Sequence, residues 1–170
     1  MSECKSFKPS IDKQSKILIL GSMPGVRSLE EQQYYAHRQN RFWRLMGIFC
    51  NVENLQDINY QEKLQILLKS KIALWDVIQS CNRDGSLDSN IQNEVPNNLQ
   101  ELLRQYPNIK GIILNGSKAY SAFKKYFPKL LMQYQCCKLP STSPANAKYK
   151  LENLYQEWKT VFDDIMNSSD

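Results

Sequence analysis

The sequence predicts an α/β fold, a three-layer α/β/α sandwich around a central four-stranded parallel sheet. Four short apolar runs recur along the 170 residues, and amphipathic stretches of helical period separate them. Apolar runs without internal charges are typical of strands that are covered on both faces, and their alternation with helices favours a parallel sheet. We expect a single domain over residues 1–170, with an ordered core over about 14–167 and frayed ends.

Each expected strand is an apolar run that stops at a glycine, a polar residue or a proline. The first, residues 16–21, has four aliphatic residues in a row before its glycine. The second, residues 72–78, contains one carboxylate, Asp76. The third, residues 111–116, lies between two glycines, and the fourth, residues 136–140, ends at a proline. These four runs are the strands of the predicted sheet.

The expected helices carry their apolar residues on one stripe. The clearest is residues 151–166, where Leu154, Trp158 and Phe162 recur at helical spacing. The other expected helices lie at residues 41–49, 60–68, 97–105 and 117–127. Strands and helices therefore alternate, with the right-handed connections that parallel strands require.

The charge balance permits a polyanionic partner without establishing one. Lys and Arg number 22 against 17 Asp and Glu, which gives a net charge of +5. Mean hydropathy is −0.54, and no apolar run approaches the ~20 residues of a membrane span. The first residues lack the continuous apolar stretch of a secretory signal. We therefore exclude a membrane protein and expect a cytoplasmic location.

Cysteine and histidine usage disfavours a metal centre. The five cysteines are odd in number and scattered, which suits a reducing compartment. The single histidine, His37, excludes any site built on two imidazoles and leaves a Ser-His-Asp triad only one possible base. We expect no metal and no other cofactor.

Candidate chemistry lies in the loops that follow the strands. The carboxyl ends of parallel strands meet at one sheet edge, and helix N-termini point their amides toward that edge. The segments expected there are residues 21–25, Asp76, residues 115–117 and residues 140–146. Small and polar side chains dominate all of them.

Two of these loops have competing interpretations. The Gly-Ser-Met-Pro-Gly loop at 21–25 could cradle a planar ligand or a phosphate, or could be a tight turn; it matches neither the P-loop nor the dinucleotide fingerprint. Residues 140–146 form a stiff, uncharged loop with two prolines. That loop could donate hydrogen bonds to phosphate oxygens, or it could simply turn the chain.

Two further features can be functional or structural. The segment 34–43 mixes aromatic, amide and cationic groups, a combination suited to stacking a nucleobase beside a phosphate. Its Phe-Trp pair is expected in the core. For Asn40 the structural alternative is a helix cap with no further role. Asp76 could be a functional carboxylate or a structural one paired with Arg83.

Taken in order, these segments resemble the uracil-DNA glycosylase superfamily. Gly-Ser-Met-Pro-Gly at 21–25 is similar to motif one of the mismatch-specific uracil glycosylases, and residues 37–43 are similar to the segment after it. Asn-Gly-Ser at 115–117 resembles the turn after the third strand. Leu-Pro-Ser-Thr-Ser-Pro-Ala-Asn-Ala at 139–147 lies where the superfamily carries motif two, the minor-groove loop.

The hypoxanthine-DNA glycosylase branch is the most similar, since residues 73–77 and 83–89 resemble it too, and the likeness covers about residues 16–160. The resemblance implies a monofunctional DNA glycosylase of base-excision repair. Such an enzyme hydrolyses the N-glycosidic bond of hypoxanthine and/or uracil in double-stranded DNA that contains a deaminated or mismatched base. We also expect this protein to be a monomer.

The chain departs from the superfamily at two positions. Some members have a catalytic Asn or Asp in motif one, but this chain has Ser22 and Met23 at the matching positions and lacks that residue. Some members also have a His that opens motif two, and this chain has Leu139 instead. In the hypoxanthine branch the catalytic Asn lies outside motif one, and Asn40 is the matching residue. The four-Cys iron–sulfur centre of the thermophilic branch cannot form, because only Cys4 lies near the N-terminus.

The resemblance implies a role for each matched residue. Asn40 positions the attacking water, and Asp76 contacts the base edge or orients the site, so both are expected to be catalytic. The expected base-binding residues are Gly21, Ser22, Met23, Pro24, Tyr35 and Asn115. The expected DNA-binding residues are His37, Arg38, Arg41, Ser117, Lys118, Ser141, Thr142, Ser143, Pro144, Ala145, Asn146 and Lys148.

The cations among these residues imply a concentrated basic face whose DNA affinity falls with salt. Apart from Lys148, no lysine lies in the matched loops, so we expect neither a Schiff base nor strand cleavage. Two alternatives stay open: a DNA-binding module that has lost catalysis, and a hydrolase of free nucleosides.

Overall fold

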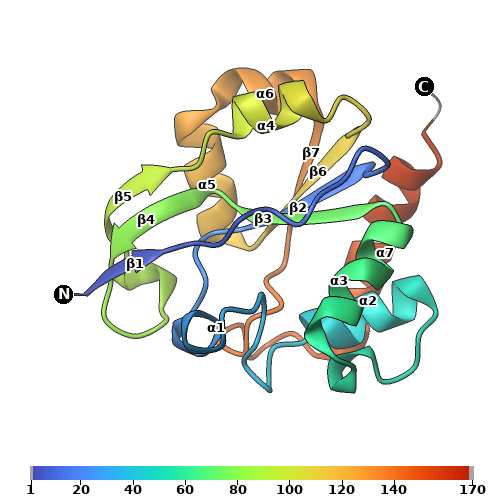
Figure 1. Ribbon diagram of the computed structural model, residues 1–170, viewed down its shortest axis with the longest axis horizontal. Helices are drawn as coiled ribbons and strands as arrows, with labels where there is room; N and C mark the ends of the chain where they lie inside the picture. The colour runs from blue at the N-terminus through green and yellow to red at the C-terminus, as the bar shows by residue number, and fades with distance from the viewer. Residues whose placement is uncertain (1, 169–170) are drawn as a thin grey trace.

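A four-stranded parallel sheet forms the centre of the computed structural model, which describes residues 2–168 (Figure 1). The strands are β2 (Ile17–Gly21), β3 (Ile72–Asp76), β6 (Gly111–Asn115) and β7 (Gln135–Leu139), in the spatial order β3-β2-β6-β7. Every neighbouring pair is parallel, which confirms the predicted sheet. In this register the last residue of β2, Gly21, lies opposite the last residue of β3, Asp76.

Helices cover both faces of this sheet, as the sequence predicts (Figure 1). On β2, Ile17 and Ile19 face one core cluster while Leu18 and Leu20 face the other, because successive side chains of a strand point to opposite faces. The first cluster is closed by α2 (Phe42–Cys50), α3 (Tyr60–Lys69) and α7 (Leu151–Met166). The second is closed by α4 (Leu99–Gln105), α5 (Ser117–Tyr126) and α6 (Pro128–Gln133).

A second, antiparallel sheet stands beside the first and was not predicted (Figure 1). It consists of β1 (Glu3–Lys5), β4 (Ile78–Asn82) and β5 (Gln92–Pro96), in the order β1-β4-β5. The expectation that the chain before residue 14 is frayed is therefore wrong. A three-residue strand with a single buried side chain, Cys4, is too short for its alternation to be recognised. Residues 169 and 170, at the tail expected to fray, lie outside the described residues.

The apolar run at 72–78 is also divided between the two sheets. β3 ends at Asp76, and after Val77 the chain enters β4 of the small sheet. The Val77 amide donates to the carbonyl of Gly21, so the residue that joins β3 to β4 is hydrogen-bonded to the end of β2. This division leaves Asp76 at the corner between the sheets.

The remaining elements are short. They are α1 (Val26–Glu31) and the 3₁₀ turns η1 (Leu55–Asp57) and η2 (Asp88–Asn90). Neither α1 nor α6 was predicted, because six residues make less than two turns of apolar periodicity. No helix within residues 2–168 combines the length and apolarity needed to cross a bilayer.

Candidate functional site

The carboxyl ends of the parallel strands enclose a cavity of about 140 Å³. Cavities of roughly 150 Å³ accept a single aromatic ring in other proteins, so a planar ring system is the natural occupant. The expected site residues that line the cavity are Gly21, Ser22, Met23, Pro24, Tyr35, His37, Asn40, Asp76, Asn115, Ser141, Thr142, Ser143 and Pro144. The strand-end segments thus meet at the sheet edge as expected, and Tyr35, His37 and Asn40, expected from the family resemblance, join them.

Asp76 enters the cavity because its neighbour in the register is a glycine. A Cβ on Gly21 would lie 2.7 Å from Asp76 Oδ1 and 3.3 Å from Tyr35 Oη, too close for any larger residue to leave the carboxyl in place. Asp76 is buried at 4% exposure, and its Oδ2 has no hydrogen-bond partner within residues 2–168. The carboxyl and the phenol converge on the space above Gly21.

The environment of Asp76 favours the protonated acid. Burial raises its pKa to about 7, the charge of Arg83 opposes that rise, and the charge of Asp88 adds to it. The alternative of a structural Asp76–Arg83 pair is not observed, because no hydrogen bond or ion pair joins the two side chains in the described structure.

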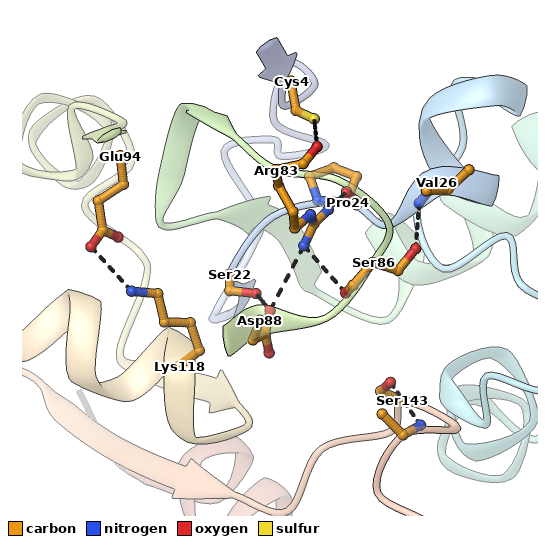
Figure 2. Close-up of polar contacts among 11 residues, drawn as sticks. Cys4, Ser22, Pro24, Val26, Arg83, Ser86, Asp88, Glu94, Lys118 and Ser143 are labelled. Carbon is orange, nitrogen blue, oxygen red and sulfur yellow. Dashed lines mark hydrogen bonds and ion pairs between the residues drawn. The ribbon is translucent and has the colours of Figure 1, made fainter. Parts of the chain in front are cut away.

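Arg83 instead fastens two loops of the site together (Figure 2). Its side chain is fully buried, and its guanidinium donates to the carbonyls of Pro24 and Ser86 and lies 4.0 Å from Asp88. Asp88 Oδ1 accepts a 2.6 Å hydrogen bond from the Ser22 hydroxyl. The segment that begins at Arg83 therefore sets the position of the 21–25 loop.

Sequence reasoning missed the contribution of this segment to the cavity. Ser86 and Asp88 both line it, and Ser86 Oγ accepts from the amide of Val26 at 2.8 Å. The signal was an Arg-Asp-Gly-Ser-Leu-Asp run that is polar enough to be taken for a solvated loop. Its likeness to a known branch was the only hint.

Two residues of the first loop that line the cavity, Ser22 and Met23, have unpaired backbone amides in the described part of the chain. The Met23 side chain packs against Ile78 of β4 in a small buried cluster, and this packing holds the loop against the small sheet. Two unpaired amides side by side are suited to a ligand carbonyl or another acceptor.

Asn40 serves the start of α2 and also reaches the cavity. Its Oδ1 accepts from the amide of Phe42 at 2.9 Å, while Nδ2 has no partner within residues 2–168. The expected capping interaction is therefore present, although the residue that bounds the helix is Arg41. Asn40 also lines the cavity, so the capping contact fixes a carboxamide at its wall.

Tyr35 forms an aromatic wall in a left-handed backbone conformation, with φ 56°. One face of its ring stacks on Phe42, with 3.9 Å between centroids and 20° between planes. Its Oη accepts a 3.4 Å hydrogen bond from Asn115 Nδ2. Since Phe42 occupies one face, only the other is available to a ligand.

Asn115 and Thr142 need correction as direct contacts. Asn115 Oδ1 accepts from the Thr142 amide at 3.0 Å, and its Nδ2 donates to Thr142 Oγ1 at 3.1 Å as well as to Tyr35. Both amide hydrogens of Asn115 are therefore used inside the protein, so it cannot donate to a base. Thr142 is fully buried and cannot touch a DNA backbone. The pair instead joins the last loop to the end of β6.

Arg41 and Lys118 also need correction as DNA contacts. The Arg41 guanidinium donates to four carbonyls of the 142–149 segment, including those of Thr142 at 3.2 Å and Ser143 at 2.6 Å, which holds that loop in shape. Lys118 Nζ lies 3.1 Å from Glu94 Oε1 in a largely buried ion pair (Figure 2). Glu94 therefore neutralises one cation of the expected basic face, while Arg41 keeps its charge but uses its hydrogen-bond donors inside the protein.

The other expected DNA-binding residues are exposed, line the cavity or line a second hollow beside it. Arg38 and His37 are exposed, and His37 Nδ1 accepts from the Gln39 amide at 3.1 Å. A second, open hollow of about 890 Å³ adjoins the cavity. Its lining includes Ser117, Ser141, Ser143, Ala145, Asn146 and Lys148.

Comparison with known proteins agrees with the motifs. The sequence-family model described as the uracil DNA glycosylase superfamily matches residues 9–164. A protein of Methanosarcina acetivorans named hypoxanthine DNA glycosylase is 41% identical over 159 residues, covering 93% of this chain and 97% of the relative. A protein of the same name from Methanosarcina barkeri is 40% identical with the same coverage.

The fold agrees as well. A solution NMR structure of a Methanosarcina acetivorans protein, provisionally described as a uracil DNA glycosylase, superposes with a TM-score of 0.82 at 38% identity, covering 98% of this chain and 100% of that one. The sequence motifs, the family match over most of the chain and this fold all lead to one assignment. The chain belongs to the uracil DNA glycosylase superfamily.

Proposed function

We propose that this chain, a DNA glycosylase by family, excises deaminated bases from duplex DNA, with hypoxanthine as the preferred base. The observation that carries the proposal is a ring-sized cavity lined by Ser22, Met23 and Asp76, since within residues 2–168 the two amides have no acceptor and the Asp76 carboxyl has no hydrogen-bond partner. The names of the two Methanosarcina relatives support the choice of hypoxanthine. Extrusion of the base is cheapest where the lesion pair is mismatched, which aids selection.

Recognition follows from what deamination changes on a base. Deamination replaces an amino group, which donates hydrogen bonds, with a carbonyl oxygen, which accepts them. A site with hydrogen-bond donors at this position therefore accepts the deaminated base and disfavours the parent base. The amides of Ser22 and Met23 supply these donors, and Asp76 contacts the base edge. The face of Tyr35 that Phe42 leaves open stacks on the ring, and Pro24 lines the same cavity.

Hydrolysis requires a water on the face of the sugar opposite the base. The transition state resembles an oxocarbenium ion, and Asn40 holds the water for attack at C1′. None of the described residues that line the cavity is a lysine, which supports hydrolysis without a Schiff base. The products are then a free base and an intact strand with an abasic site.

The hollow beside the cavity is the proposed track of the lesion strand. Ser117 at the start of α5, together with Ser141 and Ser143, offers hydroxyls to phosphate oxygens, and Lys148 adds a free positive charge. Pro144, Ala145 and Asn146 fill the gap left by the flipped base. Each chain acts alone as a monomer.

The test measures base release by chromatography from duplexes with one deoxyinosine or deoxyuridine, and from free inosine. We expect release from the inosine duplex by the wild type and by Asn108→Ala, an exposed amide outside the cavity, and a large loss with Asn40→Ala. Binding without release indicates a DNA-binding module, and release from free inosine alone indicates a nucleoside hydrolase. Equal release by Asn40→Ala excludes Asn40 from water positioning.

A further inference from the structure

The Asp76 carboxyl is the buried acid that the fold leaves without a partner. No hydrogen-bond donor within residues 2–168 reaches it, although the residue is only 4% exposed. Burying a polar group in this way costs free energy unless something pairs with it. Because Asp76 lines the cavity, the ligand is the group that can supply the missing hydrogen bond.

Burial and the groups around this carboxyl raise its pKa to about 7, so the acid form is well populated up to neutral pH. Those that face it are Tyr34 and Tyr35 from the segment before α2, Tyr60 from α3, Arg83 just after β4, and Asp88 from η2. Burial raises the pKa of each tyrosine above its ordinary value, so all three stay neutral. Burial is the main cause of the raised pKa of Asp76; the charge of Arg83 opposes the rise, and the charge of Asp88 adds to it.

The geometry aims this acid at the polar edge of a bound ring. Asp76 Oδ1 and Tyr35 Oη converge on the space that a Cβ of Gly21 would fill, at 2.7 Å and 3.3 Å from that point. The free amides of Ser22 and Met23 follow directly on the same loop. A purine whose O6 accepts from these amides therefore brings N7 next to the carboxyl, because O6 and N7 lie on the same edge of the ring.

Purine and pyrimidine leaving groups make different demands. When the C1′–N9 bond of a purine nucleoside breaks, its electron pair enters the imidazole ring, and a proton on N7 lets the base leave neutral. Uracil can leave as an anion whose charge rests on its carbonyl oxygens, where backbone amides stabilise it. A neutral carboxyl at the base edge is the type of acid that a purine needs.

We propose that Asp76 is the general acid for a purine leaving group, an inference that rests on the proposed function. The O–H bond of its carboxyl breaks as the C1′–N9 bond breaks, and the proton passes to N7. The C1′–N9 electron pair goes to the base, which departs as neutral hypoxanthine. The water held by Asn40 adds to C1′ and releases a proton to solvent, and Asp76 then takes a proton from solvent.

The test combines a protein change with a substrate change. Single-turnover rates are measured for the wild type, for Asp76→Asn and for Asp84→Asn, which makes the same change on an exposed carboxyl outside the cavity. The duplexes carry deoxyinosine, 7-deaza-deoxyinosine, which has no N7, or deoxyuridine. Fluorescence anisotropy of each variant on the inosine duplex checks that DNA binding is intact.

We expect Asp76→Asn to slow hypoxanthine release by about 10²- to 10⁴-fold with binding unchanged. The wild-type rate should fall as pH rises through about 7, where the acid form is lost, and Asp76→Asn should lose this dependence. 7-Deaza-deoxyinosine should slow the wild type to a similar extent, with no further loss in Asp76→Asn, because both changes remove the same transfer. Any uracil release should be much less sensitive to the substitution.

Rapid cleavage of 7-deaza-deoxyinosine by the wild type overturns the transfer to N7. So does an unchanged rate in Asp76→Asn, and in both cases hypoxanthine release by the wild type leaves the proposed function standing. If the wild type releases no base from any duplex, the proposed function and this inference fall together.

Discussion

Replacement of Asp76 by asparagine should stabilise the protein at neutral and higher pH. Burial of Asp76 opposes its ionisation, so the free energy of unfolding is lower at pH values where the unfolded chain ionises this carboxyl. The folded-state pKa is raised from 3.8 to about 7, a shift of roughly 3 units, and each unit corresponds to about 1.36 kcal/mol. The unfolded carboxyl ionises freely above pH 3.8 while the folded one stays protonated, so stability is lost as pH rises from 3.8 to about 7. The full loss is about 4 kcal/mol.

Asparagine has nearly the same shape and no charge, so it removes this loss. Urea unfolding of the wild type and of Asp76→Asn between pH 4 and 9 measures the difference directly. We expect the two to be almost equally stable near pH 4 and to diverge until the variant is about 4 kcal/mol more stable near pH 8. Asp84→Asn should follow the wild type throughout. A constant difference between wild type and Asp76→Asn across this range would refute the argument.

Four further substitutions test other parts of the site. Arg83→Met removes the donors to the buried carbonyl of Pro24 and the part-buried carbonyl of Ser86, and should lower the free energy of unfolding by about 1–3 kcal/mol in urea titrations, with kcat for base release falling too; unchanged stability would show that the arginine does not hold the loops together. Gly21→Ala introduces a Cβ 2.7 Å from Asp76 Oδ1 and should cost about 1–3 kcal/mol and most of the excision rate, whereas full activity would mean that the carboxyl can move aside. Lys148→Ala should reduce the slope of log affinity against log salt by about 1, while Lys118→Ala should leave it unchanged; the opposite result would mean that the Lys118 ion pair opens on DNA.

The central sheet could be predicted because its strands carry the signal on every residue. All five residues of β2 are buried, so the run is apolar throughout, and α7 carries its apolar stripe over sixteen residues. The sheet in turn predicted which loops meet, since parallel strands share one carboxyl edge. Asp76 and the 21–25 loop were therefore expected together, while Asn40 was expected from the family resemblance, and all of them line the cavity.

The polar partners within the site could not be predicted, because they depend on segments whose positions were unknown. Arg83 resembles any charged loop residue, and its burial depends on a carbonyl of Pro24, 59 residues earlier. Lys118 is paired by Glu94, a residue of β5, which the sequence did not predict. Local patterns do not specify such long-range polar pairs.

Asn115 illustrates the same limit within a correctly placed loop. Its position at the end of β6 was predicted, but its hydrogen bonds to Thr142 were not. An amide at a strand end can bind a ligand or hold a neighbouring loop, and only the loop's position decides which. Here the chain between 141 and 146 lies close enough to use both ends of the side chain.

Hydrolytic excision of hypoxanthine is tested most directly in one reaction. The wild type is incubated in excess over a duplex with one labelled deoxyinosine, with and without borohydride, and free base, strand length and protein–DNA adduct are measured. We predict free hypoxanthine equal to the substrate consumed, an intact strand with an abasic site, and no trapped adduct. Absence of free hypoxanthine, or a trapped adduct with a broken strand, would contradict hydrolysis at this site.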